Sequence, residues 1–117
     1  MNFLQLPHEK WTEFFDRMTK TIRGQLVEVE VAGLDLGDQI EAEWLPLNGV
    51  VYDAQADAVY VYTEASGGGV DHAISHPREV FAELGDSGVS QVVVLDGEGH
   101  KQFLRLRSPL ELPAVTA

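Results

Sequence analysis

Leu26-Val27-Glu28-Val29-Glu30-Val31 is the stretch that decides the fold class of this chain of 117 residues. Its valines recur at every second position, and its two glutamates occupy the positions between them. Because the side chains of a β-strand point alternately to opposite faces, the valines share one face and the glutamates share the other. The stretch therefore predicts a half-buried strand of an antiparallel sheet.

A second stretch with the same period follows a turn at residues 33–38 and ends near Pro46. Apolar and acidic side chains alternate along it, with Ile40, Ala42 and Trp44 set against Glu41 and Glu43. If the two strands pair as a hairpin, four glutamates share one outward acidic face: Glu28, Glu30, Glu41 and Glu43. Neighbouring like charges repel, so this face must be solvated or covered by basic groups. We expect Arg105 or Arg107 to lie against part of it.

Short strands separated by turns continue the β pattern toward the C-terminus. Tyr60 and Tyr62 share one face of residues 58–63, opposite two valines, so this strand is apolar on both faces. Asp96-Gly97-Glu98-Gly99 is a strong hairpin signal. Further strands are predicted at residues 50–52, 70–74, 79–84, 91–95 and 101–107, although residues 79–84 are also compatible with a short helix.

One helix is predicted, over residues 7–22. Pro7 suits the first position of a helix, and Gly24 is typical of the residue that ends one. Helical spacing places five apolar side chains on one face: Trp11, Phe14, Phe15, Met18 and Ile22. This stripe predicts a helix that faces the core, with a partner-binding face as the alternative.

One helix followed by six to eight short strands predicts an α+β domain with an antiparallel sheet. We expect a single domain over residues 1–117, with a β-rich region at about 25–107 and an extended tail at 108–117. The helix packs on a curved sheet, or the strands close into a small β-barrel or roll. We prefer the barrel or roll, with the helix at one end, similar in outline to Sm-like or SH3-like barrels.

Composition excludes several classes of function. Nineteen acidic residues against eight lysines and arginines give a net charge of −11, which argues against nucleic acid and anionic membranes as partners. The absence of cysteine removes disulfides, thiolate metal sites and cysteine nucleophiles. The first residues form neither a signal peptide nor a membrane helix, and we expect a soluble protein.

The negative charge is concentrated in the middle of the chain. Residues 24–77 hold ten acidic residues and no lysine or arginine, whereas basic residues occur on both sides of this block. Such a block is typical of a solvated outer face. The alternative is an electrostatic surface for a cationic partner or for the basic ends of the chain itself.

Several short motifs resemble one family. They are Trp11 with Phe14 in the opening helix, Val29-Glu30-Val31, Leu45-Pro46-Leu47-Asn48-Gly49-Val50, His72-Ala73-Ile74-Ser75-His76-Pro77, and Asp96-Gly97 before Leu104-Arg105. Together they resemble the small bacterial proteins of the DUF5335 family over about residues 6–107. The resemblance implies a bacterial, cytoplasmic, stand-alone domain of unknown function, and it supplies no catalytic residues.

His72 and His76 are the strongest candidates for a chemical site. Two histidines four residues apart share a metal on a helix, but in a strand they lie about 13 Å apart. Pro77 disfavours helical geometry at His76, so no metal site is predicted. The segment Gly67-Gly68-Gly69 lacks the lysine of a phosphate loop, and no cofactor is predicted. No nucleophile, base and orienting residue combine into a catalytic set.

Two functional hypotheses follow. The first is a non-catalytic interaction or scaffold domain that binds a protein partner or self-associates, with Trp44, Tyr60, Tyr62 and the four glutamates at its surface. The second is a small-ligand-binding or enzymatic domain in which His72, His76 and Tyr52 line a pocket. The first is preferred, because no catalytic set can be assembled from the sequence.

Overall fold

The computed structural model describes residues 2–22, 24–35, 37–64 and 72–111. Within these ranges a strand precedes a 3₁₀ turn (His8–Lys10) and helix α1 (Trp11–Thr21), and seven further strands follow. The strands are β1 (Asn2–Leu6), β2 (Leu26–Gly33), β3 (Gly37–Asp53), β4 (Ala58–Thr63), β5 (His72–Ser75), β6 (Glu79–Gly85), β7 (Gly88–Leu95) and β8 (Lys101–Leu110).

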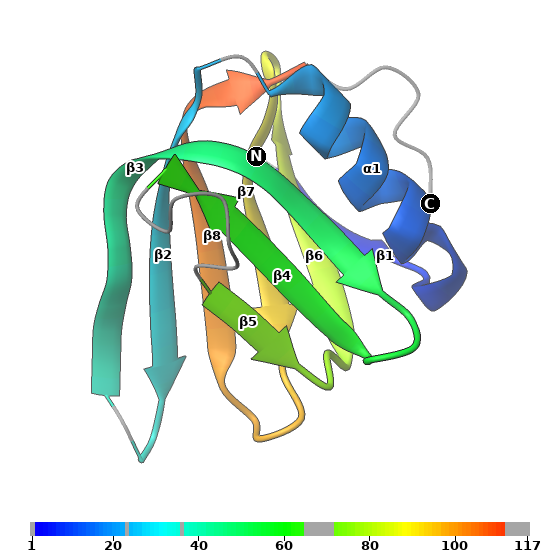
Figure 1. Ribbon diagram of the computed structural model, residues 1–117, viewed down its shortest axis with the longest axis vertical. Helices are drawn as coiled ribbons and strands as arrows, with labels where there is room; N and C mark the ends of the chain where they lie inside the picture. Colours follow the sequence, from blue (N-terminus) through cyan, green and yellow to red (C-terminus); the bar gives the residue numbers. More distant parts are fainter. Residues whose placement is uncertain (1, 23, 36, 65–71, 112–117) are drawn as a thin grey trace.

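All eight strands belong to one antiparallel sheet in the order β1-β6-β7-β8-β2-β3-β4-β5. The sheet curves strongly but does not close, and β1 and β5 are its two edges (Figure 1). Of the two predicted arrangements, the structure therefore confirms the helix on a curved antiparallel sheet and not the closed barrel.

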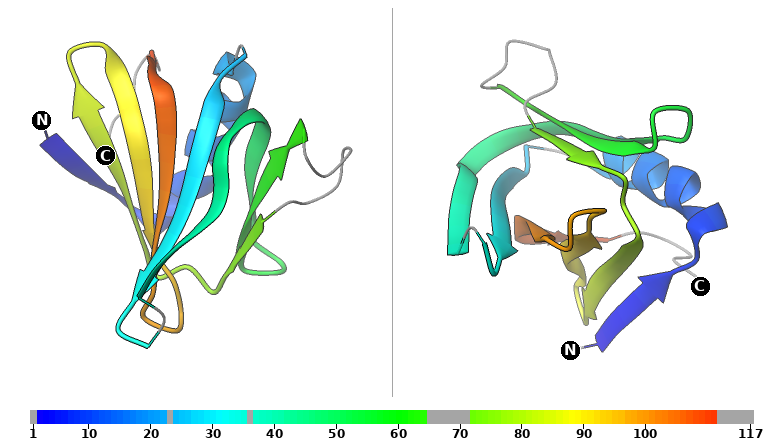
Figure 2. Two further views of the ribbon diagram at one scale, coloured as in Figure 1. Left: turned by 90° about the vertical axis from the view of Figure 1, so that its left-hand side faces the viewer. Right: turned by 90° about the horizontal axis from the view of Figure 1, so that it is seen from below.

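Strand β3 makes the curvature. Its first half pairs with β2 and its second half pairs with β4, so it passes from one layer of the fold to the other (Figure 2, right). Trp44 has a φ of 50° in this strand, and the register with β4 shifts between Leu47 and Gly49. Bulges of this kind bend a strand and increase its twist. The bend folds β4 and β5 over the strands β6, β7 and β8.

Helix α1 covers the open side between the two layers and packs on β3. Its buried residues are Trp11, Phe14, Phe15 and Met18, four of the five predicted apolar positions. Thr19 fixes the helix to the second half of β3, because its Oγ1 donates to the carbonyl of Val50 at 2.7 Å and accepts from the Val50 amide at 3.0 Å. The indole N–H of Trp11 donates to the carbonyl of Leu6 at 3.0 Å.

Element bounds differ from the predicted ones at both ends of the described chain. Strand β1 was not predicted, and the regular helix starts at Trp11 instead of Pro7. Residues 79–85 form a strand, as the favoured interpretation had it, and β8 continues to Leu110 into the expected tail. The predicted glycine loop at 67–69 and the start of the strand predicted at 70–74 lie outside the described residues.

Candidate functional site

Arg105 lies against one side of the predicted acidic face, beside Glu28 and Glu30. In the register of β2 and β8, Arg105 pairs with Glu28, and Phe103 pairs with Glu30. The Nη1 atom of Arg105 donates to Glu28 Oε1 at 3.1 Å and to Glu30 Oε1 at 2.5 Å. The guanidinium also lies 4.8 Å from the centroid of the Phe103 ring. One arginine is thus held by two carboxylates, as the charge distribution led us to expect, and by an aromatic face that was not predicted.

The charges around Arg105 are coupled. The hydrogen bond from Arg105 lowers the pKa of Glu30, while a hydrogen bond with Glu30 raises the pKa of Asp38. Burial alone would lower the pKa of Arg105, but the two glutamates outweigh burial and raise it. One arginine faces two glutamates here, so this face retains an excess of carboxylate.

The prediction that Ile40 shares the face of Ala42, opposite the glutamates, is wrong. Ile40 pairs with Glu30 and not with a buried valine, and its exposed fraction is 50%. In β3, Glu41 is an extra residue, because Ile40 pairs with Glu30 and Ala42 pairs with the adjacent residue of β2, Val29. A second irregularity places two residues of β3, Glu43 and Trp44, opposite the single residue Glu28. Each extra residue moves the following side chains to the other face. Strict alternation therefore holds in β2 but not in β3.

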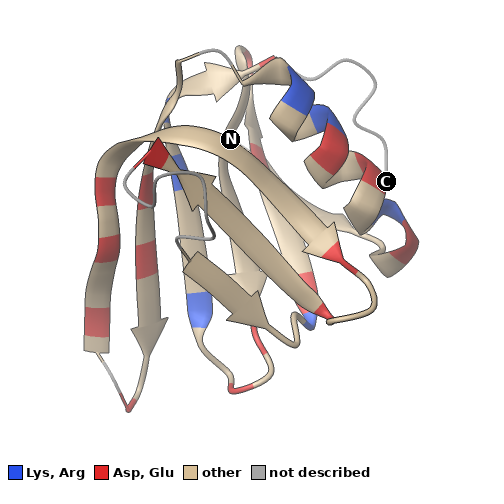
Figure 3. Cartoon of the chain, in the orientation of Figure 1, with Lys and Arg blue, Asp and Glu red and all other residues tan. Residues whose placement is uncertain are grey.

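Trp44 also lies outside the core. It is half-buried, and the Arg107 guanidinium lies 5.3 Å from the centroid of its ring. Glu41 and Glu43 are exposed beside it, whereas Glu28 and Glu30 are half-buried. Figure 3 shows these acids along β2 and the first half of β3, away from the helix. Glu28 and Glu30 therefore lie half-buried on β2 beside Arg105, and Glu41 and Glu43 are exposed on the adjacent strand β3.

An apolar row crosses the outer face of the larger layer. Phe81 in β6 pairs with Val93 in β7, and Val93 pairs with Phe103 in β8. The line continues through Glu30 in β2, which pairs with Phe103 on one side and with Ile40 in β3 on the other. The first three apolar side chains are half-buried, and α1 lies on the other side of these strands (Figure 2, left). We call Phe81, Val93, Phe103 and Ile40 the outer apolar row. It meets the Arg105 cluster at Phe103.

Tyr60 and Tyr62 lie on a separate outer face. Both are half-buried on β4, while Val59 and Val61 on the opposite side of the strand are fully buried. Tyr60 pairs with Val51 on one side and with Ala73 on the other. These tyrosines belong to the smaller layer and take no part in the outer apolar row.

Tyr52 and His76, two of the predicted ligand-binding residues, meet at Asp57. The Tyr52 hydroxyl donates to Asp57 Oδ1 at 2.9 Å, and His76 Nδ1 lies 3.3 Å from Asp57 Oδ2. His8 Nε2 lies 3.2 Å from the Tyr52 hydroxyl and extends the chain of contacts to the start of α1. His8 was not predicted as part of this site, because it lies 44 residues along the chain from Tyr52. The contact of Asp57 with His76, 19 residues away, likewise depends on the fold and not on local spacing.

The environment of Asp57 favours its ionised form. Hydrogen bonds from Tyr52 and then His76 lower the pKa of Asp57, while burial first and Asp57 second raise the pKa of Tyr52. Asp57 and His76 have φ values of 51° and 52°, a region that non-glycine residues rarely adopt. The His76 amide also donates to the Asp57 carbonyl at 2.8 Å. The cluster fastens the β3–β4 turn to the segment after β5.

His72 belongs to a different network. Its Nε2 lies 2.6 Å from Oε1 of Gln102, whose amide donates to Asp96 Oδ2 at 2.8 Å. Asp96 also accepts the backbone amides of Glu98 and His100 and orders the β7–β8 hairpin. The predicted trio of His72, His76 and Tyr52 is therefore divided between two networks. No group of three or more potential ligands suited to a metal ion occurs among the described residues.

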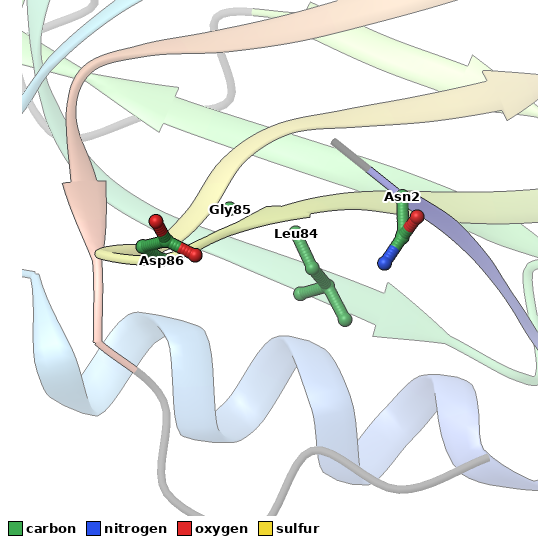
Figure 4. A pocket seen from close by; sticks show the side chains of 4 residues that line it. All are labelled: Asn2, Leu84, Gly85 and Asp86. Carbon is green, nitrogen blue, oxygen red and sulfur yellow. The ribbon is translucent and has the colours of Figure 1, made fainter.

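One pocket lies at a distance from both networks along the sheet. It is lined by Asn2 from β1 and by Leu84, Gly85 and Asp86 from the end of β6 and the turn after it (Figure 4). None of the predicted ligand-binding residues lines it. Its polar groups are one amide and one carboxylate, so it offers no catalytic set.

The fold and these surfaces define a mostly β member of the α+β class, in which one short helix packs on an open antiparallel sheet. Across the described residues, no helix is long and apolar enough to cross a membrane.

The chain belongs to the DUF5335 family, described as a family of unknown function, whose profile matches residues 2–115. It is also 33% identical, over 108 residues, to a protein of Aquifex aeolicus (strain VF5) described as uncharacterized; the match covers 92% of this chain and 95% of that protein. No solved structure matches the chain. The family resemblance stated from the motifs is confirmed.

Proposed function

We propose that the protein is a non-catalytic interaction domain that docks a protein segment on its outer sheet face. The docking surface consists of the outer apolar row together with its polar neighbours Glu28, Glu30 and Arg105. Protein interfaces commonly combine an apolar centre with a polar rim. A cytoplasmic location, which the family resemblance implies, suits a chain without cysteine.

The observation that carries this proposal is the pairing of Phe81, Val93 and Phe103 in one register line across three adjacent strands. The outward positions of a sheet with one wet face are normally polar, so aligned apolar side chains need a reason other than the core. Ile40 extends the line beyond Glu30 with half of its surface exposed. A partner that covers this line would remove apolar surface from water.

The charge beside the row defines the chemistry of the partner. Glu28 and Glu30 share Arg105, Asp38 contacts Glu30, and Glu41 and Glu43 are exposed nearby. A docked segment that alternates apolar with basic residues would satisfy both the row and the excess carboxylates. An acidic segment, or nucleic acid, would be repelled by the same surface.

Amide chemical shifts test where such a segment binds. The probe is a short peptide that alternates lysine with valine, and the control peptide carries glutamate in place of lysine. We expect the lysine peptide to shift amides of β6, β7, β8 and the first half of β3, and to bind more weakly as salt rises. Shifts confined to β4 and β5, or equal binding of the glutamate peptide, would refute the proposal.

A second candidate function is the binding of a small polar ligand at Asp57. Two potential donors meet at Asp57, from Tyr52 and His76, and His8 contacts the Tyr52 hydroxyl beside them. Asp57 and His76 also have unusual backbone conformations. Such conformations cluster at functional sites. Titration with inorganic phosphate, followed through the imidazole resonances of His8 and His76, tests this candidate. Saturable shifts of both rings in wild type, with the His8 shift lost in His76→Ala, would support it, and unsaturable shifts would refute it.

A further inference from the structure

Strand β1 is an edge of the sheet with one hydrogen-bonding side open. It pairs with β6 in an unbroken register from Asn2 opposite Leu84 to Leu6 opposite Val80. Among the described strands, none pairs with its other side. Backbone groups along such an edge are free to pair with another strand.

The sequence of β1 lacks the features that normally protect an edge. Asn2-Phe3-Leu4-Gln5-Leu6 contains no charge, proline or glycine, and its pairing shows no bulge. Natural sheets use lysine, proline, bulges or very short strands to prevent edge-to-edge pairing. Phe3 is 55% exposed on this strand, which adds apolar surface to the open edge. The opposite edge, β5, has only four residues.

Charge favours β1 as the place where two copies of this chain meet. At a net charge of −11, most surfaces of two copies repel each other. The acidic strands β2 and β3 lie four and five positions away from β1 in the sheet order. Antiparallel pairing of an uncharged strand with itself places no like charges opposite each other. Because β1 carries no charge, a second copy can pair with it without supplying a positive charge.

We propose that the protein self-associates through antiparallel pairing of β1 with β1 of a second copy. The two-fold axis passes by Leu4, so that Phe3 lies opposite Gln5 of the second copy. Because Gln5 pairs with Phe81 within each copy, Phe3 then extends the outer apolar row of its neighbour. The sheets of the two copies become continuous across this junction.

The contact is small, so the dimer is expected to be weak. Stable interfaces bury about 800 Å² on each partner, more than pairing of five residues provides. A dissociation constant on the order of 100 µM is expected. The dimer leaves the Arg105 cluster exposed, so the dimer proposal is independent of the docking proposal. If the protein does not dimerise, peptide binding beside Arg105 is still expected.

Sedimentation velocity of the full chain from about 10 µM to about 1 mM tests the proposal across the expected range. Phe3→Lys introduces the kind of charge that protects natural edges, and Ala73→Lys places the same charge on the exposed surface of the other edge strand, β5. We expect wild type and Ala73→Lys to dimerise alike and Phe3→Lys to stay monomeric with an unchanged melting temperature. Monomeric wild type at about 1 mM, or an equally dimeric Phe3→Lys, would overturn the proposal.

Cysteine crosslinking tests the geometry directly, because the chain has no cysteine of its own. Residues facing each other at the two-fold axis have Cα atoms about 4.5 to 5.5 Å apart, within the range of a disulfide. Leu4→Cys is therefore expected to form a covalent dimer at least tenfold faster than Ser75→Cys, its control on β5. Equal rates would overturn the pairing at Leu4.

Discussion

Arg105 and Glu30 are 75 residues apart in the chain, and a hydrogen bond of 2.5 Å joins Nη1 of the first to Oε1 of the second across β8 and β2. The same nitrogen contacts Glu28 at 3.1 Å. This pair connects the acidic middle of the chain to strand β8, and it lies between Phe103 and Ile40 of the outer apolar row.

Removing the charge of Arg105 is expected to destabilise the fold. Arg105→Met leaves Glu28 and Glu30 half-buried beside Asp38 without their shared cation, at a cost of about 1–2 kcal/mol in a partly solvated site. Arg107→Met is the matched control, because Arg107 is exposed and contacts only the ring of Trp44 in the described contacts. Urea unfolding measures both variants, and equal stabilities would show that the Arg105 bonds contribute nothing.

Thr19 is expected to hold the helix in place on β3. Thr19→Val keeps the shape of the side chain but removes both bonds to the backbone of Val50, at a cost of about 1–3 kcal/mol. Thr12→Val makes the same change on an exposed position of α1 and is expected to alter the stability by less than about 0.5 kcal/mol. Thermal unfolding compares the two, and a cost at Thr12 as large as that at Thr19 would contradict this role.

His100 makes the stability depend on pH. Its Nε2 lies 2.8 Å from Asp35 Oδ1, and this hydrogen bond, with the nearby charges of Asp35, Asp96 and Glu98, raises the pKa of His100 above its ordinary value of 6.5. A raised pKa in the folded state stabilises the protein at pH values below 6.5, and this contribution disappears as pH rises through the folded pKa. Stability is therefore expected to fall across that interval.

Replacing Asp35, the acid that contacts His100, tests whether this pair causes the pH dependence of stability. Asp35→Asn is expected to flatten the loss of stability above pH 6.5, while Asp86→Asn, an exposed acid in the β6–β7 turn, is expected to leave it unchanged. Urea midpoints measured at several pH values provide the comparison. An Asp35→Asn protein with the same pH dependence as wild type would assign the effect to another group.

The backbone conformation and close packing at Gly88 require glycine, whereas those at Gly85, in the same turn, do not. Gly88 has a φ of 118°, and a Cβ there would lie 2.2 Å from the carbonyl oxygen of Leu110, whereas a Cβ on Gly85 meets no atom within 4 Å. Gly88→Ala is expected to cost about 2 kcal/mol or more, and Gly85→Ala less than about 0.5 kcal/mol. Similar unfolding midpoints for the two variants would contradict the contact with β8.

Much of the fold follows from local patterns in the sequence. The valines of β2 and the aromatic stripe of α1 identify one buried face each, and the Asp96-Gly97 segment marks a hairpin that the structure contains. β1 was missed because its five residues lack strict alternation and precede a proline. The bulges that turn Ile40 outward depend on pairing with β2, which no local pattern in β3 reveals.

The candidate surfaces were predictable only in part. Segregation of charge along the chain predicted Arg105 or Arg107 against the acidic face, and Arg105 is the one that contacts Glu28 and Glu30. The outer apolar row was not foreseen, because Phe81, Val93 and Phe103 become neighbours only through the order of β6, β7 and β8. Long-range register likewise brings Asp57 to His76 and separates His72 from both.

The affinity of the lysine–valine peptide for two matched variants tests the docking surface most directly. Phe81→Gln removes an aromatic ring from the outer apolar row, and Tyr62→Gln removes one from the outer face of β4, where both rings are half-buried. We expect calorimetry to show binding weakened by about tenfold in Phe81→Gln, or about 1.4 kcal/mol, and unchanged within about twofold in Tyr62→Gln. Equal affinities in the two variants, or a greater loss in Tyr62→Gln, would contradict docking on this face.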